Sequence, residues 1–328
     1  MNRSLCPSRM AWMVATALIL CGCEKEAAKP AAPAAPTQPP RSEAAMQIER
    51  LVTTGRISEA DRLVDEYAPG QTEPNWEFLN IAARAKLNAG KSAEALAFAE
   101  KALALQPRDT QSKVVLGVAL ARSGQAAQGE KLVSEMANRF SKDSVFQCQL
   151  AEVRVLAGKL PEAERAAREA VKLASDDTSK NALIARTHHA LGQVLLAQQR
   201  YPESIAELRV AIEFDNKSPA LHYSLSRALA RSGKLDDARA SAERAVMLAP
   251  TNAAFLVWLG NIFMDQKQAG PAAAALEKAV QLDPNFKPAW LGLAKAAGLN
   301  GNAARAKAAD EKAKSLPADS AGEIIFLP

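Results

Sequence analysis

The chain has 328 residues, of which 48% are hydrophobic and only 5% aromatic. This amount of apolar surface can offset the entropy of ordering a chain, so the composition excludes an intrinsically disordered protein. Three of the four cysteines lie within the first 23 residues, which excludes a disulfide scaffold. Lys and Arg exceed Asp and Glu by 41 to 36, or by 39 to 36 without Arg3 and Arg9 of the leader described below. Because both signs are mixed along the chain, we expect no nucleic acid partner.

Residues 1–22 have the features of a bacterial signal peptide. Residues 1–9 carry two basic residues and no acidic one, and residues 10–20 form an apolar run of eleven residues. A bilayer-spanning helix needs about 20 residues, whereas a basic segment before a shorter apolar run is typical of a secretory signal. Cleavage of an ordinary secreted protein near this point and an uncleaved anchor are the alternatives.

Residues 20–23, Leu-Cys-Gly-Cys, resemble the bacterial lipobox, in which small residues precede the cysteine that is modified. Cys21 departs mildly from this pattern, because Ala or Ser is usual there. The resemblance implies that Cys23 becomes the acylated first residue, and several acyl chains hold a protein firmly on a membrane. Glu24 follows in place of Asp, which in such lipoproteins favours the outer membrane. We therefore expect a lipid-anchored envelope protein, at the outer membrane and facing the periplasm.

A tether follows the lipidation site within residues 23–41. Residues 24–41 contain five Pro and six Ala among eighteen residues. Proline removes hydrogen-bond donors and favours extended backbone, so no packed element is predicted here. At about 3.1 Å per residue, this segment would hold a folded domain some 50 Å from the bilayer.

Small residues recur every 34 residues through the rest of the chain, apart from a first interval of 35 residues and one longer interval of 41 residues. One row consists of Ala60, Ala95, Gly129, Ala163, Ser204, Ala238, Ala272 and Ala306, and a second consists of Ala83, Gly117, Ala151, Gly192, Ser226, Gly260 and Ala294. Each period holds two amphipathic helices with a turn between them, usually at a glycine. Pro161, Pro202 and Pro271 are expected to open second helices, where a missing N–H costs little.

This pattern resembles the tetratricopeptide repeat, whose consensus places small residues at the helix crossings and Pro at the end. The best match is residues 219–252, with Leu225, Leu229, Ala238, Ala245 and Pro250 at consensus positions. The resemblance implies an all-α fold, a right-handed superhelical solenoid of helix-turn-helix repeats. Such a stack leaves an extended inner face on which these proteins bind partners.

Eight units are predicted, as two blocks of four at residues 42–177 and 185–318. Residues 178–184 are an insertion that extends a helix or bends the stack, and residues 319–328 form a tail. The first and last units depart most from the pattern, with Ile48 in a small-residue row and Asp310 at an aromatic position. Both units are expected to be caps, because a terminal repeat presents one face to water.

Helical periodicity indicates which side chains of each first helix point away from its neighbours. The family resemblance implies that these residues line a concave, protein-binding groove, and we call them the inner-face residues. They are Asn80, Arg84, Asn88, Val114, Val118, Arg122, Val155, His189, Gln193, Tyr223, Arg227, Arg231, Asn261, Asp265 and Lys295. The valines, with Cys148, would hold apolar side chains, and Tyr223, Arg227 and Arg231 would receive a carboxylate. The family's carboxylate-clamp pattern is not reproduced, and a solvated face without a ligand is the alternative.

Catalytic and metal sites are not predicted, and we expect neither an enzyme nor a cofactor. Gly90-Lys91-Ser92 lacks the leading glycine of a phosphate loop and falls at a repeat turn. His188, His189 and His222 have no third metal ligand at helical spacing. Cys148 would be the only thiol left after lipidation, and its neighbours offer no activation.

The function predicted from these features is a membrane-anchored scaffold or adaptor that assembles or stabilises a cell-envelope protein complex. Its partners would be envelope proteins or peptide segments. The alternatives are a regulatory subunit of an envelope enzyme and a structural homo-oligomer. Residues 323–328 (EIIFLP) are unusually apolar. We expect them to fold against the last unit as a cap, and insertion into the groove of another copy or another protein is the alternative.

Overall fold

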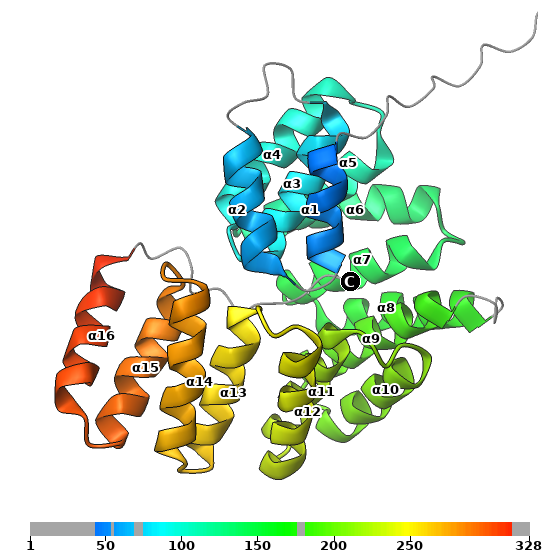
Figure 1. Ribbon diagram of the computed structural model, residues 1–328. Coiled ribbons are helices and arrows are strands. Elements are labelled where there is room, and N and C mark those ends of the chain that lie inside the picture. The colour runs from blue at the N-terminus through cyan, green and yellow to red at the C-terminus, as the bar shows by residue number, and fades with distance from the viewer. Residues whose placement is uncertain (1–42, 54–55, 69–74, 176–180, 317–328) are drawn as a thin grey trace, which may run out of the picture. The chain divides into compact units, whose positions relative to one another are not determined.

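The computed structural model describes residues 43–53, 56–68, 75–175 and 181–316, and these ranges contain sixteen α-helices and no strand (Figure 1). The helices form eight consecutive pairs. The first helices are α1 (Glu43–Thr53), α3 (Trp76–Asn88), α5 (Thr110–Arg122), α7 (Ser144–Leu156), α9 (Asn181–Ala197), α11 (Pro219–Arg231), α13 (Ala253–Asp265) and α15 (Lys287–Leu299). The second helices are α2 (Ile57–Tyr67), α4 (Ser92–Leu105), α6 (Ala126–Arg139), α8 (Leu160–Ser175), α10 (Tyr201–Phe214), α12 (Leu235–Leu248), α14 (Ala269–Leu282) and α16 (Ala303–Ser315). The predicted all-α solenoid is confirmed.

The 34-residue period sets where the helices begin. Helices α3, α5 and α7 start at Trp76, Thr110 and Ser144, and α11, α13 and α15 continue with the same spacing. Helix α9 is the exception, with 17 residues where the other six have 13. It begins at Asn181, inside the insertion predicted at residues 178–184. The insertion thus adds a turn to a first helix.

The turns within the units require a left-handed backbone. Gly90 and Gly124 adopt φ values of +78° and +90°, which glycine tolerates because it has no Cβ. In the fifth and seventh units Gln199 and Lys267 occupy the equivalent turns, with φ values of 63° and 61°. Both turns therefore keep the left-handed backbone of the glycine turns at the cost of some strain, since residues other than glycine rarely adopt a positive φ.

The small-residue rows lie at the helix crossings. A Cβ atom added to Gly117 would lie 2.5 Å from Val133 Cγ2 and 3.1 Å from the carbonyl oxygen of Gly129. In the fifth unit the hydroxyl of Ser204 donates to the carbonyl oxygen of Gly192 at 2.7 Å, across the same crossing. Because no larger side chain fits between the paired helices, these positions fix how closely the helices pack.

The first helices form a continuous layer. Contacts join α1 to α3, α3 to α5, α5 to α7, α7 to α9 and α9 to α11, and α13 to α15 further along. Between α11 and α13, the ring centroids of Tyr223 and Phe255 lie 5.2 Å apart. Each second helix packs mainly against its own first helix and the first helix of the next unit. In a curved stack, the layer whose members touch directly is the inner one. The first helices therefore form the inner layer, as the family resemblance implied.

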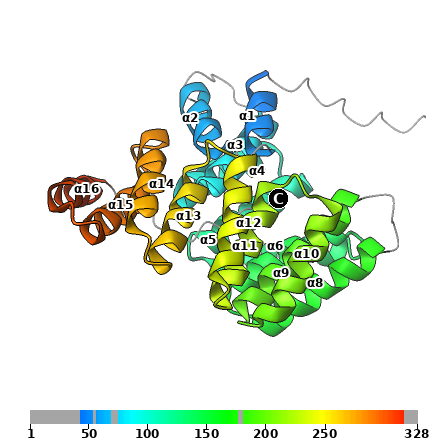
Figure 2. The same ribbon diagram turned by 60° about the horizontal axis from the view of Figure 1, so that its bottom comes forward.

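The first unit also contacts units far along the chain. Ile57, the first residue of α2, is 7% exposed and packs with Tyr223 of α11 and Phe255 of α13. Ala89 of the turn after α3 and Trp258 border the same apolar cluster. Figure 2 shows the helices concerned from a second direction. This packing, between residues more than 160 positions apart, was not predicted from the sequence.

The predicted signal peptide, the predicted lipidation site Cys23, the predicted tether and the tail at residues 319–328 lie outside the described residues. Within the described ranges, none of the helices combines the length and hydrophobicity that crossing a bilayer requires.

Candidate protein-binding face

The inner-face residues all lie on first helices, and their exposure varies widely. Asn80, Asn88, Val114, Val118, His189 and Tyr223 are buried, as is Cys148. Arg84, Arg122, Val155, Gln193, Arg227 and Asn261 are partly exposed. Arg231, Asp265 and Lys295 are exposed. Whether this set binds a partner stays a prediction.

Asn80 links the second and third units. Its Nδ2 donates to Ser112 Oγ at 2.7 Å, and that hydroxyl donates to Asp109 Oδ2 at 2.7 Å. Asp109 also accepts from the Ser112 backbone N–H and so caps α5. No donor among the described residues reaches Asn80 Oδ1, although the residue is only 4% exposed. A buried amide oxygen of this kind is a ready acceptor for a backbone N–H.

Arg122 links three units. One guanidinium nitrogen, Nη1, donates to the carbonyl oxygen of Leu87 at 3.1 Å, and Nη2 donates to Glu152 Oε1 at 2.8 Å. The Leu87 carbonyl is at the end of α3, where helices leave acceptors without intrahelical partners. Part of the inner face therefore holds the stack together.

An aromatic group surrounds Tyr223. Its ring centroid lies 5.2 Å from that of Phe255 and 6.0 Å from that of Trp258, and the guanidinium carbon of Arg227 lies 5.8 Å from its centroid. Aromatic pairs and cation–π contacts at these distances are favourable. Tyr223 thus packs against the sixth–seventh unit junction and orients Arg227.

Positive charges act on two buried side chains of the inner layer, His189 and Cys148. Burial lowers the pKa of His189 to about 4, and the positive charges of Arg186 and Arg227 act in the same direction. Burial raises the pKa of Cys148 to about 12 despite the nearby charge of Arg186. Cys148 is therefore a poor nucleophile, since the thiolate is the reactive form.

Sequence reasoning missed Arg186, although a signal for it was present. Arg186 lies on α9 three residues before the inner-face residue His189, and residues three apart share one face of a helix. Arg186 is partly exposed, and its positive charge lowers the pKa of both His189 and Cys148.

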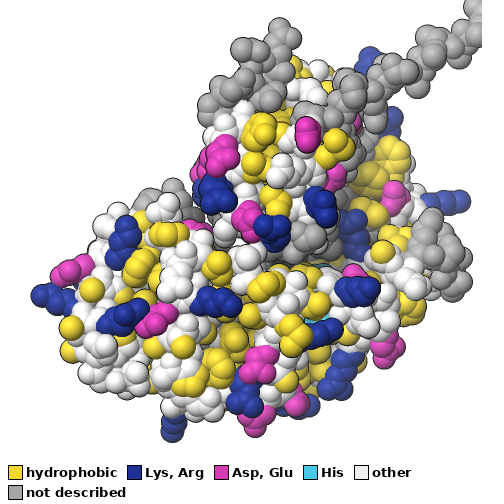
Figure 3. Space-filling view, in the orientation of Figure 1, with side chains coloured by type: hydrophobic (Ala, Val, Ile, Leu, Met, Phe, Trp, Pro, Cys, Tyr) yellow, Lys and Arg dark blue, Asp and Glu magenta, His cyan; other side chains and the backbone are white. Residues whose placement is uncertain are grey.

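Charge is divided unequally between the two layers. The first helices α3 to α15 carry ten basic residues and three acidic ones, a net of +7. The second helices α4 to α16 carry fourteen basic and sixteen acidic residues, a net of −2. Figure 3 shows Lys and Arg side chains interspersed with hydrophobic ones on one face of the molecule. The basic excess of these helices thus lies in the inner layer, although Lys86, Arg122 and Arg154 already pair with carboxylates. The remaining positive charge favours acidic partners.

Lys86 is a basic residue of α3 with a structural role. Its side chain is fully buried, and its Nζ lies 2.7 Å from Asp61, 2.5 Å from Asp65 and 2.9 Å from Glu94. Burial alone would lower the pKa of Lys86, but the hydrogen bonds to these three carboxylates raise it. The residue joins α2, α3 and α4, and nothing in the sequence pattern indicated this role.

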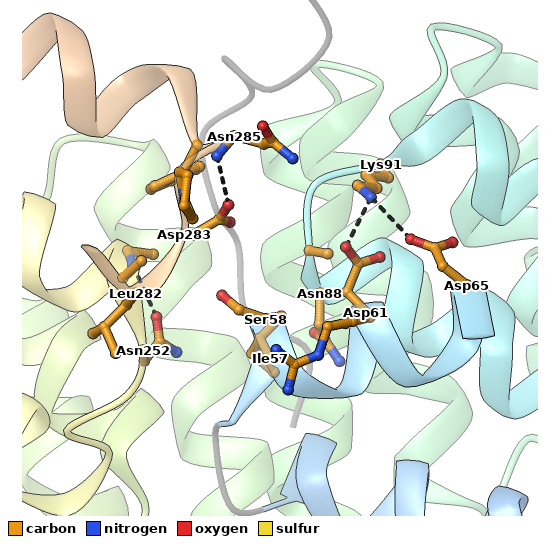
Figure 4. A pocket seen from close by; sticks show the side chains of 16 residues that line it. Ile57, Ser58, Asp61, Asp65, Asn88, Lys91, Asn252, Leu282, Asp283 and Asn285 are labelled. Carbon is orange, nitrogen blue, oxygen red and sulfur yellow. Dashed lines mark hydrogen bonds and ion pairs between the residues drawn. The ribbon is translucent and has the colours of Figure 1, made fainter. Parts of the chain in front are cut away.

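A polar pocket of about 290 Å³ lies where the first unit meets the seventh (Figure 4). Asp61 and Lys91 line one side, joined by an ion pair of 2.8 Å, and Asp283 lines the other. Burial and the charge of Asp61 raise the pKa of Asp283. Asn88 also lines the pocket, and no donor among the described residues reaches its Oδ1. Because lysines already pair with Asp61, the pocket has no strong preference for a cation.

Among the described residues, no group of three or more His, Cys, Asp or Glu side chains is arranged to hold a metal ion. His188 is instead paired with Glu207, whose Oε2 lies 2.6 Å from its Nδ1.

Family models described as tetratricopeptide repeat match three ranges of the chain. One matches residues 144–217, and the other matches residues 82–143 and 223–285. Together these ranges cover more than half of the sequence, and the chain belongs to the tetratricopeptide-repeat family. A comparison with curated proteins found no significant match.

Several solved structures are similar in fold at low sequence identity. A chain of the APC/C hetero-tetramer Cut9–Hcn1 is 16% identical with a TM-score of 0.49, over 77% of this chain and 48% of that one. This chain thus matches about half the length of that relative. Two MamA structures are 20% and 21% identical, both with TM-scores of 0.44, over 52% and 50% of this chain and 89% and 92% of theirs.

Proposed function

We propose that this protein is a lipid-anchored scaffold that holds cell-envelope proteins together through its inner face. The repeat family and the paired-helix fold support a role in protein interaction. The observation that carries the proposal is the concentration of basic residues in the inner layer, a net of +7 on α3 to α15 against −2 on α4 to α16. We infer that the partner segment is acidic.

The envelope location rests on the sequence before the helices. A basic leader, an apolar run of eleven residues and Leu-Cys-Gly-Cys at 20–23 precede an Ala/Pro-rich tether. An acylated Cys23 would anchor the chain, and the tether would let the solenoid reach proteins some 50 Å from the bilayer.

Cell fractionation tests the anchor. Changing Cys23→Ala should move the protein from the membrane to the soluble fraction, while the matched change Cys21→Ala should leave it at the membrane. Equal membrane association of both variants would rule out lipidation at Cys23.

Crosslinking in cells tests the partner-binding face. The double change Arg227→Glu and Arg231→Glu reverses two inner charges on α11. The matched control is Arg209→Glu with Arg244→Glu, two exposed residues on second helices. We expect the first pair to abolish specific crosslinked products and the control pair to retain them. Loss with both pairs, or with neither, would contradict the proposal.

A further inference from the structure

The polar pocket between the first and seventh units has the size and position of a small-molecule site. Its volume of about 290 Å³ is close to the lower limit for such sites, so an occupant must be small. The start of α2 and the turn between α3 and α4 form one side, and the turns that precede α13 and α15 form the other (Figure 4). Turns held by a rigid scaffold are common positions for binding residues.

Asn88 supplies a hydrogen-bonding group that the fold leaves unsatisfied. It is the last residue of α3, its side chain lines the pocket, and the residue is only 4% exposed. Its Oδ1 accepts no hydrogen bond from the described residues. An amide can also turn to present its nitrogen, so Asn88 can serve a ligand as acceptor or donor. Because an unpaired buried amide destabilises a fold, a ligand that bonds to it gains affinity.

Asp283 lines the other side of the pocket, in the turn between α14 and α15. Its Oδ1 accepts the backbone N–H of Asn285 at 3.0 Å, and no Lys or Arg among the described residues forms an ion pair with it. Burial and the charge of Asp61 disfavour the ionised form and raise the pKa of Asp283. A hydrogen-bond donor on a ligand would therefore stabilise this carboxylate.

The charged groups on the first side already have partners. Lys91 Nζ lies 2.8 Å from Asp61 and 3.7 Å from Asp65. Lys86 pairs with the same two carboxylates. A charged ligand would disturb these pairs and leave one of their members uncompensated. A hydroxyl has one donor and two acceptor sites, so it can add a bond to either member of a pair. The lining thus favours a neutral ligand rich in hydroxyls.

Much of the remaining lining is apolar. Ile57, Leu282 and Phe286 contribute large apolar side chains. A sugar ring suits such a lining, because its C–H groups pack on apolar and aromatic side chains while its hydroxyls reach the polar groups. An open, flexible polyol has no such rigid apolar face and loses more conformational freedom on binding.

We propose that this pocket binds a neutral, hydroxyl-rich ring of the size of one sugar residue. Its hydroxyls bond to Asn88, to Asp283 and to the Asp61–Lys91 pair, and its C–H face packs on Phe286. Because the site takes residues from the first and seventh units, a bound sugar also strengthens the contact between them. The sugar is either free or one residue of a glycan chain.

The test uses the full chain, purified in a detergent without a sugar headgroup. Saturation-transfer NMR measures the binding of glucose, galactose and N-acetylglucosamine, each as the free sugar and as its methyl glycoside. We expect at least one to bind with a Kd of about 1 mM. Binding of the free sugar alone indicates a free ligand, whereas binding of the glycoside as well indicates a residue of a chain.

Two variants and one matched control place the binding in this pocket. Asp283→Ala and Asn88→Leu should each weaken it at least about tenfold. Asp215→Ala should leave the Kd unchanged, although Asp215 also accepts a backbone N–H two residues further on, that of Lys217 at 3.1 Å. Asn88→Leu should keep or raise Tm, since it removes an unpaired buried amide. A structural role of Asn88 would instead lower Tm.

Three results would overturn the inference. One is that none of the sugars binds to the natural chain while circular dichroism shows it to be folded. Another is an affinity that Asp283→Ala leaves unchanged, or that Asp215→Ala lowers equally. The third is tighter binding of a charged probe, arginine or citrate, than of any sugar. None of these results bears on partner crosslinking through Arg227, so the proposed function is tested separately.

Discussion

The imidazole Nε2 of His189 lies 2.8 Å from Ser224 Oγ, which joins the first helices of the fifth and sixth units. Gln193 Nε2 reaches the same ring nitrogen at 2.8 Å. An amide nitrogen can only donate, so this ring nitrogen accepts and the buried imidazole is neutral. The positive charges of Arg186 and Arg227 oppose its protonation further.

This arrangement predicts acid sensitivity between about pH 6.5 and 4. In the unfolded chain His189 binds a proton near pH 6.5, whereas in the folded chain its pKa is about 4. The unfolded state therefore takes up more protons in this window, and stability falls as pH decreases. At pH 5 the loss is about 2 kcal/mol.

Thermal melts at pH 7 and pH 5 check this prediction. The change His189→Gln should reduce the loss of Tm between the two pH values. His222→Gln serves as the comparison, because burial also lowers the pKa of His222 but the residue is only partly buried in the fold. If His189→Gln loses as much Tm between the two pH values as the natural chain does, the buried imidazole of His189 is not the source of the acid sensitivity.

Gly129→Ala should destabilise the third unit. The added Cβ would lie 3.0 Å from the backbone nitrogen of Ala121 and 3.1 Å from its Cβ, and closer still to the carbonyl oxygen of Gly117. Because backbone atoms cannot rotate away, we expect a cost of about 1–3 kcal/mol. Calorimetry should show a lower Tm.

Gly270→Ala is the matched control for that change. Gly270 lies in the first turn of α14, and nothing is within 4 Å of its added Cβ. Its Tm should be unchanged or slightly higher, since Ala favours a helix more than Gly does. Equal effects of the two substitutions would show that close packing does not account for the glycine at 129.

Lys86→Met should weaken the packing of α2, α3 and α4, because it removes the cation that three carboxylates share. Asp61, Asp65 and Glu94 would then face one another with Lys91 as their remaining nearby cation in the described part of the chain. Removing one partner of a buried ion pair costs about 3–5 kcal/mol, and the partial exposure of these carboxylates places the expectation at the lower end. Urea unfolding measures this loss of stability, and the exposed change Lys101→Met is the control. The same unfolding midpoint in both variants would contradict the structural role of Lys86.

The burial of Cys148 predicts that its thiol is labelled slowly in the folded chain. Its pKa of about 12 leaves almost no thiolate at pH 8, so maleimide should react slowly with the folded chain and quickly in denaturant. If Cys23 is acylated and the leader removed, the denatured mature chain should take up one label per molecule. Rapid labelling in the native state would contradict the burial of Cys148.

The helix pairs could be predicted because their signal is local and repeated. Gly117, Gly192 and Gly260 recur where helices cross, and any residue with a larger side chain would collide with its neighbour there. The contact of Ile57 with Phe255 could not be predicted in this way. It depends on the rotation accumulated over six units, to which each helix pair adds a little.

The exposure of the inner face was harder to anticipate than its position. Periodicity identified Asn80 and His189 as pointing away from their packing faces, but both are buried. Neighbouring first helices touch, and Ser112 and Ser224 from the next unit bond to these side chains. A single-helix pattern contains no information about the helix that follows it 34 residues later.

Site-specific photo-crosslinking in cells can show whether the inner face binds an envelope protein. A photoreactive residue replaces Gln193 on the inner face or, as the control, Glu213 on the exposed side of α10. We expect position 193 to yield a defined crosslink to an acidic segment of an envelope protein, which is lost with Arg227→Glu, and position 213 to yield none. Equal products from both positions, or a product at 193 that is indifferent to Arg227→Glu, would contradict it.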